Sequence, residues 1–321
     1  MKKLLVIICL LCFLLTGCSD IKITDKTEQN ISHAVSGEEA NNFLIVSNED
    51  IENPPIVSKE DVDNSSQVMV PILMFHDVRT IEGGEWSMSS ANFRKTLVFL
   101  LENGYTPISL QQLVDYVDDK SKIPEKPVCI TFDDGYFSNY RYVLPIVTEL
   151  KVPITLFMTC NTIRQDEIDP CSDENILYKL STAELEIMEA SPFVQVQSHT
   201  YGLHGENTTY SDVVRMSSWP IENESEEEFK KIYAKDCETV ENILKGIGVD
   251  KCFALSYPNG RYHEWTEDVL AERGYRVSVT SDFHRVNLVT QGKPESLFLL
   301  GRMNVNDKTT EEKLLQYLER K

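Results

Sequence analysis

The sequence predicts an α/β fold built around a parallel sheet, and three observations support this prediction. Short apolar, β-prone runs alternate with segments of helical periodicity from about Val70 onward. About 250 residues follow position 68, enough for a single (β/α) barrel. Polar residues suited to chemistry stand directly after several apolar runs, where barrel enzymes carry their working side chains.

Residues 1–17 are expected to be a signal peptide. Lys2 and Lys3 precede the apolar run 4–15, which is short for a membrane span. The run ends in Leu-Thr-Gly-Cys18, which is similar to the bacterial lipoprotein box, where cleavage leaves the cysteine as a lipid-bearing N-terminus. We therefore expect a lipid anchor at Cys18, on the extracellular face of the bacterial cytoplasmic membrane. The alternative is an ordinary secretory signal with an accidental cysteine.

Residues 18–68 are expected to be an acidic flexible tether, because few apolar groups interrupt a polar, acidic stretch. Residues 69–321 then form one catalytic domain. The formal net charge is −20 at pH 7, with no basic patch, which argues against nucleic acid as a partner. Such an acidic surface would accept a neutral or cationic glycan.

The first elements have clear local signals. The apolar run 70–75 is the first expected strand. Ser90 opens a helix that ends at Gly104, with an apolar face that comprises Phe93, Leu97, Leu100 and Leu101. Ser109 and Gln112 have the spacing of a capping box for the next helix.

Alternation continues through the rest of the chain. A buried strand is expected at 127–130, a helix at 140–150 and a strand at 154–158. A capped helix follows from Ser181, then a strand at 193–197. The charged helix 225–245 has three glutamates near its start, where the helix dipole favours anions. Further strands are expected at 276–280 and 297–300.

Two stretches carry the candidate chemistry. Asp133 and Asp134 end the buried strand and precede a glycine; alone, they would also fit a turn that caps a helix. His199 and His204 follow the strand at 193–197. Imidazole and carboxylate are good ligands for zinc or a similar divalent ion, and three protein ligands leave a position open for water.

These stretches resemble two motifs of the polysaccharide deacetylases, the NodB-homology family or carbohydrate esterase family 4. The resemblance covers roughly residues 70–305. It implies a distorted (β/α) barrel in which Asp133 is the general base. It also implies one divalent ion bound by Asp134, His199 and His204, expected to be zinc, with cobalt, nickel, manganese or iron as alternatives. The five-residue histidine spacing resembles that of the poly-N-acetylglucosamine deacetylase branch.

Further residues are implied by the same resemblance. Tyr257 and Pro258 belong to a motif that walls the substrate groove, and the backbone N–H of Asn259 would stabilise the oxyanion. Arg302 would orient the base; the alternative is a surface or strand-end ion pair. Asp282 is a candidate for the fourth motif.

The general acid is expected to be His76. The family's usual Leu-x-His near the C-terminus is missing, and the Leu-Met-Phe-His76 context resembles an N-terminal segment of a permuted branch. The alternative is a structural histidine bonded to Asp77 or another carboxylate.

Cysteine and tryptophan leave alternatives open. Cys129 is expected to be a buried hydrophobe, while pairing among Cys160, Cys171, Cys237 and Cys252 cannot be read from sequence. The tryptophans either stack on sugars or pack in the core; they are Trp86, Trp219 and Trp265.

The function implied by the resemblance is metal-dependent removal of N-acetyl groups from N-acetylglucosamine units of an extracellular or cell-wall polysaccharide. The alternatives are an O-acetyl esterase acting on a polysaccharide such as xylan, a catalytically inactive glycan-binding lipoprotein, and a solute-binding lipoprotein of a transporter. The natural polymer and the oligomeric state do not follow from the sequence.

Overall fold

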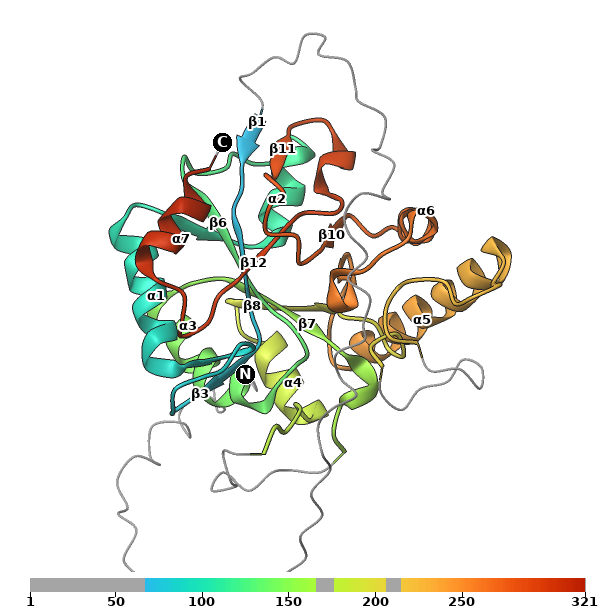
Figure 1. Cartoon of the computed structure of the whole chain (residues 1–321), viewed down its shortest axis with the longest axis horizontal. Helices are drawn as coiled ribbons and strands as arrows, with labels where there is room; N and C mark the ends of the chain where they lie inside the picture. Colours follow the sequence, from blue (N-terminus) through green and yellow to red (C-terminus); the bar gives the residue numbers. More distant parts are fainter. Residues whose placement is uncertain (1–66, 166–175, 206–214, 321) are drawn as a thin grey trace, which may run out of the picture. The chain divides into compact units, whose positions relative to one another are not determined.

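Eight parallel strands form the centre of the structure, and helices surround them (Figure 1). The computed structural model describes residues 67–165, 176–205 and 215–320, all within the compact unit Asp61–Lys321. The strands are β1 Gln67–Met69, β2 Ile72–Phe75, β3 Asp77–Arg79, β4 Ser87–Ser89, β5 Thr106–Ile108, β6 Pro127–Phe132, β7 Ile154–Met158, β8 Val194–Ser198, β9 Ala254–Ser256, β10 Val277–Val279, β11 Leu288–Thr290 and β12 Met303–Asn304. The α-helices are α1 Ser90–Glu102, α2 Leu110–Val117, α3 Leu144–Leu150, α4 Thr182–Glu189, α5 Glu226–Gly246, α6 Glu264–Glu272 and α7 Glu311–Leu318.

The parallel sheet is curled, so that one chain segment, 300–304, contacts strands near both of its ends. Its strand order is β10-β9-β8-β7-β6-β2-β12, with β5 also paired to β6. Met303 and Asn304 of β12 pair with β2, while Leu300, just before them, forms a parallel bridge with Val279 of β10. The segment 300–304 therefore contacts both edges, and the expectation of a distorted α/β barrel of the NodB type is confirmed as a curled parallel sheet.

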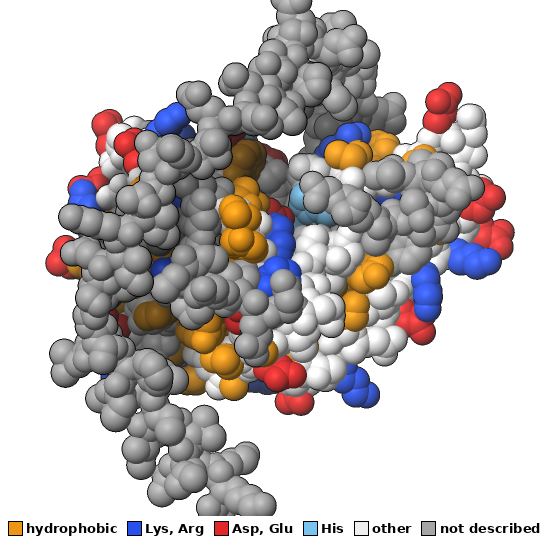
Figure 2. All heavy atoms as spheres, turned by 90° about the horizontal axis from the view of Figure 1, so that it is seen from below, with side chains coloured by type: hydrophobic (Ala, Val, Ile, Leu, Met, Phe, Trp, Pro, Cys, Tyr) orange, Lys and Arg blue, Asp and Glu red, His pale blue; other side chains and the backbone are white. Residues whose placement is uncertain are grey.

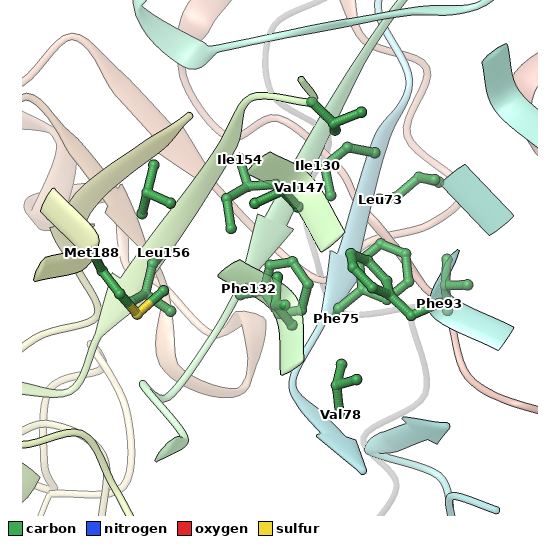
Figure 3. Packing of buried hydrophobic residues seen from close by; sticks show 14 of the residues in the cluster. Leu73, Phe75, Val78, Phe93, Ile130, Phe132, Val147, Ile154, Leu156 and Met188 are labelled. Atoms are coloured by element: carbon green, nitrogen blue, oxygen red, sulfur yellow. The ribbon is translucent and has the colours of Figure 1, made fainter. Parts of the chain in front are cut away.

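An aromatic triangle fixes the ends of the two central strands (Figure 3). Phe75 of β2 lies 5.3 Å, centroid to centroid, from both Phe93 of α1 and Phe132 of β6, and Phe93 lies 5.4 Å from Phe132. All three rings are buried. Because successive strand residues point to opposite faces, packing of Phe75 and Phe132 against the helix turns His76 and Asp133 toward the inside of the curled sheet.

Helix starts follow the local signals in the sequence. Complete capping boxes form at α2 (Ser109 with Gln112), α4 (Ser181 with Glu184) and α5 (Ser225 with Glu228). Short turns interrupt the chain elsewhere: the π-helix η3 Asn139–Val143 leads into α3, and the 3₁₀ turns are η4 Cys160–Thr162, η5 Pro258–Gly260 and η6 Pro294–Leu297.

Three local expectations were wrong. Leu101 is exposed, because α1 buries Phe93, Leu97 and Leu100, and Leu101 lies about 100° further round the helix. A strand was expected at 297–300. Instead, turn η6 ends at Leu297, and Leu299 has a positive φ of 57°, which interrupts an extended chain. Gln67 and Val68, assigned to the tether, form β1, which pairs antiparallel with β11.

Four cysteines lie in the part of the chain that the structure describes. Cys129, Cys160 and Cys237 are buried free thiols, and Cys252 is a half-buried free thiol. The confirmed burial of Cys129 raises the pKa of its thiol, which keeps it protonated. Cys171 and Cys18 lie outside the described residues. Among the described helices, none has the length and apolar character needed to cross a membrane.

Candidate active site and metal centre

The carboxylate pair lies in the loop that leaves β6. Asp134 adopts a left-handed backbone conformation (φ 73°), and so does Gly135 (φ 66°). Glycine is favoured at position 135 because other residues rarely adopt this φ, and a Cβ there would also require the Met158 side chain to move. This sharp turn brings two adjacent carboxylates to the same end of the sheet and gives them different neighbours.

Asp134 meets two histidines from the loop after β8. Its Oδ1 lies 3.4 Å from Nε2 of His199 and 3.3 Å from Nε2 of His204. One ligand atom from each of the three residues lies within 4.8 Å of the others, a cluster that could hold a metal ion. The sequence prediction that these residues come together is met by this geometry, and the donors are typical of a divalent transition-metal site.

The hydrogen bonding of His199 tests whether an ion fits. Its Nδ1 lies 2.8 Å from the carbonyl oxygen of Ser256, which can only accept, so Nδ1 carries the proton. The lone pair of Nε2 therefore faces Asp134, where two acceptors confront each other unless a cation or a proton lies between them. A backbone carbonyl that fixes the ring of a metal-binding histidine is a common outer contact of such sites.

Charge around Asp134 agrees with this reading. Burial disfavours its ionised form, yet the neighbouring imidazoles of His199 and His204 hold the pKa of Asp134 well below its ordinary value. Burial also opposes charge on His204, but the neighbouring Asp134 raises the pKa of His204 above its ordinary value. The carboxylate thus attracts positive charge to this point.

Asp133 has a different partner, Arg302. The guanidinium donates two parallel hydrogen bonds, from Nη1 to Oδ1 (2.8 Å) and from Nη2 to Oδ2 (2.7 Å). Arg302 is 1% exposed, so this ion pair between two strand ends is buried and does not lie at the surface. Burial opposes ionisation of Asp133, but the charge of Arg302 outweighs it and lowers the pKa of Asp133 to about 2. The carboxylate is therefore ionised and held in one orientation.

His76 leaves β2 and faces the same site. The alternative of a hydrogen bond to Asp77 is not seen, because the Asp77 carboxylate accepts from Arg79 and from Oγ of Ser138 (2.6 Å). The Nδ1 atom of His76 is buried without a hydrogen-bond partner. Burial lowers the pKa of His76, and the charges of Asp133 and Asp134 oppose that shift.

The turn after β9 supplies the opposite wall. Asn259 has φ 56°, and its side chain donates to the carbonyl of Met216 at 2.9 Å. Tyr257 lines the cavity, although its ring is buried and its hydroxyl bonds Thr266 and Glu267. Pro258 is buried and is not among the cavity-lining residues, so its predicted place in the groove wall is not seen.

Comparison with known proteins decides the family. The family model described as Polysaccharide deacetylase matches residues 120–278, which span the carboxylate pair, both histidines and the turn after β9. The matched region belongs to the polysaccharide deacetylase family. The resemblance to this family seen in the sequence is thereby confirmed.

Individual members of the family are distant in sequence. "Putative polysaccharide deacetylase YxkH" of Bacillus subtilis (strain 168) is 24% identical over 66% of this chain and 64% of its own length. The poly-beta-1,6-N-acetyl-D-glucosamine N-deacetylase of Staphylococcus aureus (strain MSSA476) is 24% identical over 48% of this chain and 52% of its own. The chain thus spans about half to two thirds of the length of these relatives. The structure of a de-N-acetylase from Aggregatibacter actinomycetemcomitans superposes with a TM-score of 0.64 at 20% identity, over 78% of this chain and 100% of that chain.

The candidate site opens into a cavity of about 580 Å³. His76, Asp133, Asp134, His199 and His204 all line it, as do Asn259 and Arg302. On the face in Figure 2, hydrophobic side chains lie beside Lys or Arg side chains and a histidine. The cavity lining also includes the apolar side chains of Met74 and Leu177, and a mixed lining suits a ligand that has both polar and apolar groups.

Ser256 contacts both Asp133 and His199, a role not foreseen from the sequence. Its hydroxyl donates to Oδ2 of Asp133 at 3.1 Å, while its carbonyl accepts from His199. Its only sequence signal is its place directly before Tyr257. Lys179 was also missed: its Nζ lies 3.9 Å from Oδ2 of Asp134 and 3.6 Å from the ring centroid of Tyr136.

One candidate, Asp282, lies away from the cavity. The carboxylate of Asp282 accepts from the backbone N–H of His284 at 2.9 Å, and Asp282 is not among the cavity-lining residues.

The backbone around the site has an unusual conformation: Asp134, Thr200 and Asn259 all have positive φ without being glycine. Such conformations concentrate at functional sites, where the surrounding fold holds them.

Proposed function

We propose that this chain is a metal-dependent hydrolase that removes N-acetyl groups from N-acetylglucosamine units of an extracellular or cell-wall polysaccharide. One observation carries the proposal. A carboxylate fixed by a buried arginine, Asp133 with Arg302, stands beside a separate cluster of metal-binding type, Asp134 with His199 and His204. Splitting adjacent carboxylates between base and ligand is what metal-assisted hydrolysis requires.

Each residue has a role in the proposed reaction. A divalent ion held by Asp134, His199 and His204 would polarise the acetyl carbonyl and acidify water. Asp133 accepts the proton of the attacking water, and Arg302 keeps its carboxylate aimed. The backbone N–H of Asn259 donates to the oxyanion that develops on the acetyl carbonyl. His76 gives a proton to the departing nitrogen.

The choice of an amide rather than an ester substrate rests on His76. An amine is a poor leaving group unless it is protonated, whereas an alcohol leaves from an acetyl ester with less help. The imidazole of His76 lines the cavity, close enough to Asp133 and Asp134 for their charges to affect its pKa. It is therefore placed to protonate the departing amine. The name of the Staphylococcus aureus relative, a poly-beta-1,6-N-acetyl-D-glucosamine N-deacetylase, favours the same substrate class.

The proposed location is the outer face of the cytoplasmic membrane, through a lipid on Cys18. Support comes from the sequence alone: a short apolar run after Lys2 and Lys3 ends in Leu-Thr-Gly-Cys. An acidic tether between this anchor and the catalytic domain would let the site reach glycan above the membrane.

The test is acetate release by the full chain from defined substrates. We expect release from β-1,6- and β-1,4-linked N-acetylglucosamine oligomers, loss of release with a chelator, and recovery when zinc or cobalt is restored. Faster release from acetylated xylan than from both oligomers would favour the O-acetyl esterase. Binding of an oligomer without any acetate release, in metal-loaded protein, would favour the inactive glycan-binding alternative.

A further inference from the structure

Trp86 is exposed at the mouth of the cavity. Its side chain is 52% exposed, although tryptophan is a large apolar residue whose exposure to water is unfavourable. It lines the same cavity as the metal-binding cluster. The edge of the ring system meets the imidazole of His76, with centroids 4.9 Å apart and planes at 67°. Core packing therefore does not explain the position of this indole.

Two asparagines near the C-terminus hold the backbone next to Trp86. The carbonyl oxygen of Glu85 accepts from Nδ2 of Asn304 and from Nδ2 of Asn306, each at 2.9 Å. Both bonds come from the opposite end of the domain sequence. They fix the peptide that leads directly into Trp86.

Asp307 holds the same loop at two further points. Its carboxylate accepts from the backbone N–H of Gly83 and from that of Ser89 at 3.0 Å. It also accepts from Nδ2 of Asn92 on α1 at 2.9 Å. The loop is therefore clamped before and after Trp86. A Cβ at Gly83 would collide with the backbone of Ser87, so the loop is also tightly folded on itself.

The other two tryptophans are placed differently. Trp219 is 44% exposed, but it is not among the cavity-lining residues, and the guanidinium of Arg261 lies 5.5 Å from its ring centroid. Trp265 is half-buried and packs against His263 and Phe229. Of the three, Trp86 alone lines the cavity.

We propose that Trp86 is a platform for a sugar ring of the substrate, and that Asn304, Asn306 and Asp307 are its positioning residues. One face of a pyranose carries mainly C–H groups, which pack on an aromatic ring while the hydroxyls stay in water. A platform beside His76 would bind a ring close to the departing nitrogen. This inference rests on the proposed function for its substrate class, a glycan.

The clamp links the platform to the catalytic base. Arg302 and Asn304 are two residues apart in an extended segment, so their side chains leave on the same side. Arg302 fixes Asp133, and Asn304 fixes the loop of Trp86. A single segment thus sets the spacing between the base and the sugar ring, which would favour one geometry of bound substrate.

A binding experiment tests the platform without requiring turnover. The Asp133→Asn protein, loaded with zinc, is titrated with β-1,6- and β-1,4-linked N-acetylglucosamine pentamers, by tryptophan fluorescence and by calorimetry. We expect an emission change that is lost when Trp86→Phe is added and retained when Trp219→Phe is added instead. An emission change that survives Trp86→Phe, or binding by calorimetry that is unaffected by Trp86→Ala, would overturn the platform.

Kinetics separate positioning from a merely structural role. Trp86→Ala should raise KM for the pentamers about tenfold, whereas KM for 4-nitrophenyl acetate, which has no sugar ring to pack on the indole, should rise much less. The double variant Asn304→Ala/Asn306→Ala should shift KM in the same direction and red-shift the emission of Trp86. Equal losses on both substrates with a lowered melting temperature would instead assign these residues a structural role and overturn the proposal.

The outcomes distinguish this inference from the proposed function. Acetate release that is indifferent to Trp86 would refute the platform and leave the deacetylase intact. Pentamer binding that depends on Trp86, with no acetate released by the parent from any glycan, would support the platform and refute the deacetylase. Failure of both pentamers to bind would refute the platform.

Discussion

The guanidinium of Arg302 donates two hydrogen bonds, of 2.8 and 2.7 Å, to the carboxylate of Asp133. Both side chains are almost fully buried. Arg302 has no hydrogen-bonding capacity left over: its Nε donates to the carbonyl of Thr280 at 2.9 Å, and its two Nη atoms also reach the hydroxyls of Thr131 and Ser256. These additional bonds hold the guanidinium in one position, so that it in turn holds the Asp133 carboxylate in one orientation.

Arg302→Lys should fold but lose about 10–10²-fold in kcat, because an ammonium keeps the charge and cannot form the paired bonds. The measurement is kcat with metal content and melting temperature. Arg276→Lys is the matched control, since Arg276 makes a similar pair with Asp118 away from the cavity. Equal kcat values for the Arg302→Lys and parent proteins would refute the orienting role.

Removal of a metal ligand should lower metal occupancy as well as rate. Asp134→Ala and His204→Ala proteins are expected to contain much less zinc than the parent by elemental analysis, whereas Asp133→Asn should retain the ion and lose turnover. Because the charge of Asp134 raises the pKa of His204, protons should compete with the ion, and affinity should fall as the pH is lowered. Full occupancy in either alanine variant would show that the ligands are different.

His76→Ala should cut kcat by about 10²–10⁴-fold, the usual contribution of a general acid, while the metal stays bound. Since the protonated imidazole is the active form, the parent should lose rate as the pH rises through the pKa of His76, and the variant should lack that decline. His284→Ala, a histidine outside the cavity-lining set, should behave as the parent. The reverse pattern, with His284→Ala inactive, would place the acid elsewhere.

Stability should depend on pH through Glu189. Burial raises the pKa of this carboxyl to about 7, although the backbone N–H of Val196 donates to it at 2.8 Å. The folded state thus binds the proton more tightly than the unfolded state, whose glutamate pKa is about 4.3. The resulting stabilisation is fully present below that value and is lost as the pH rises through about 7.

The neutral variant Glu189→Gln should therefore raise the melting temperature at pH 8 by roughly 3–6 °C, with a difference that shrinks toward zero near pH 4. Glu186→Gln, at an exposed position on the same helix, is the control and should follow the parent at every pH. A Glu189→Gln curve parallel to that of the parent would show that the carboxyl is already ionised at little cost.

Cys18→Ala should release the protein from membranes or leave its signal peptide uncleaved, because no other residue of the lipobox can carry the lipid. Fractionation of cells that express parent or variant, with a mass measurement of the mature N-terminus, checks this. Cys129→Ala is the control, since that thiol is buried in β6. A processed Cys18→Ala protein that still partitions with membranes would locate the anchor elsewhere.

The parts of the fold and site that could be predicted are those with local signals. The capping boxes at Ser109, Ser181 and Ser225 lie within three residues of their partners, and the mainly apolar strands β2 and β6, which precede His76 and Asp133, are buried throughout. The metal-binding cluster also follows local patterns, because parallel strands bring their carboxyl ends to one edge of the sheet.

The rest depends on contacts between distant residues. The role of Arg302 was open in the sequence because its partner Asp133 is 169 residues away. Ser256 and Lys179 carry no local mark of their contacts with the site. The strand expected at 297–300 failed for another reason: Leu299 takes a left-handed conformation that its sequence neighbours do not announce.

The segment 300–304 contacts both β2 and β10 of the curled sheet. The proposed site is incomplete until this segment is in place. This segment is among the last parts of the domain to be synthesised, and it supplies Arg302 to Asp133 and Asn304 to the loop of Trp86. A chain that has folded only as far as β10 would hold an Asp133 without its arginine and a tryptophan loop without its clamp. Hydrolysis would then begin only after the last strand has docked against β2.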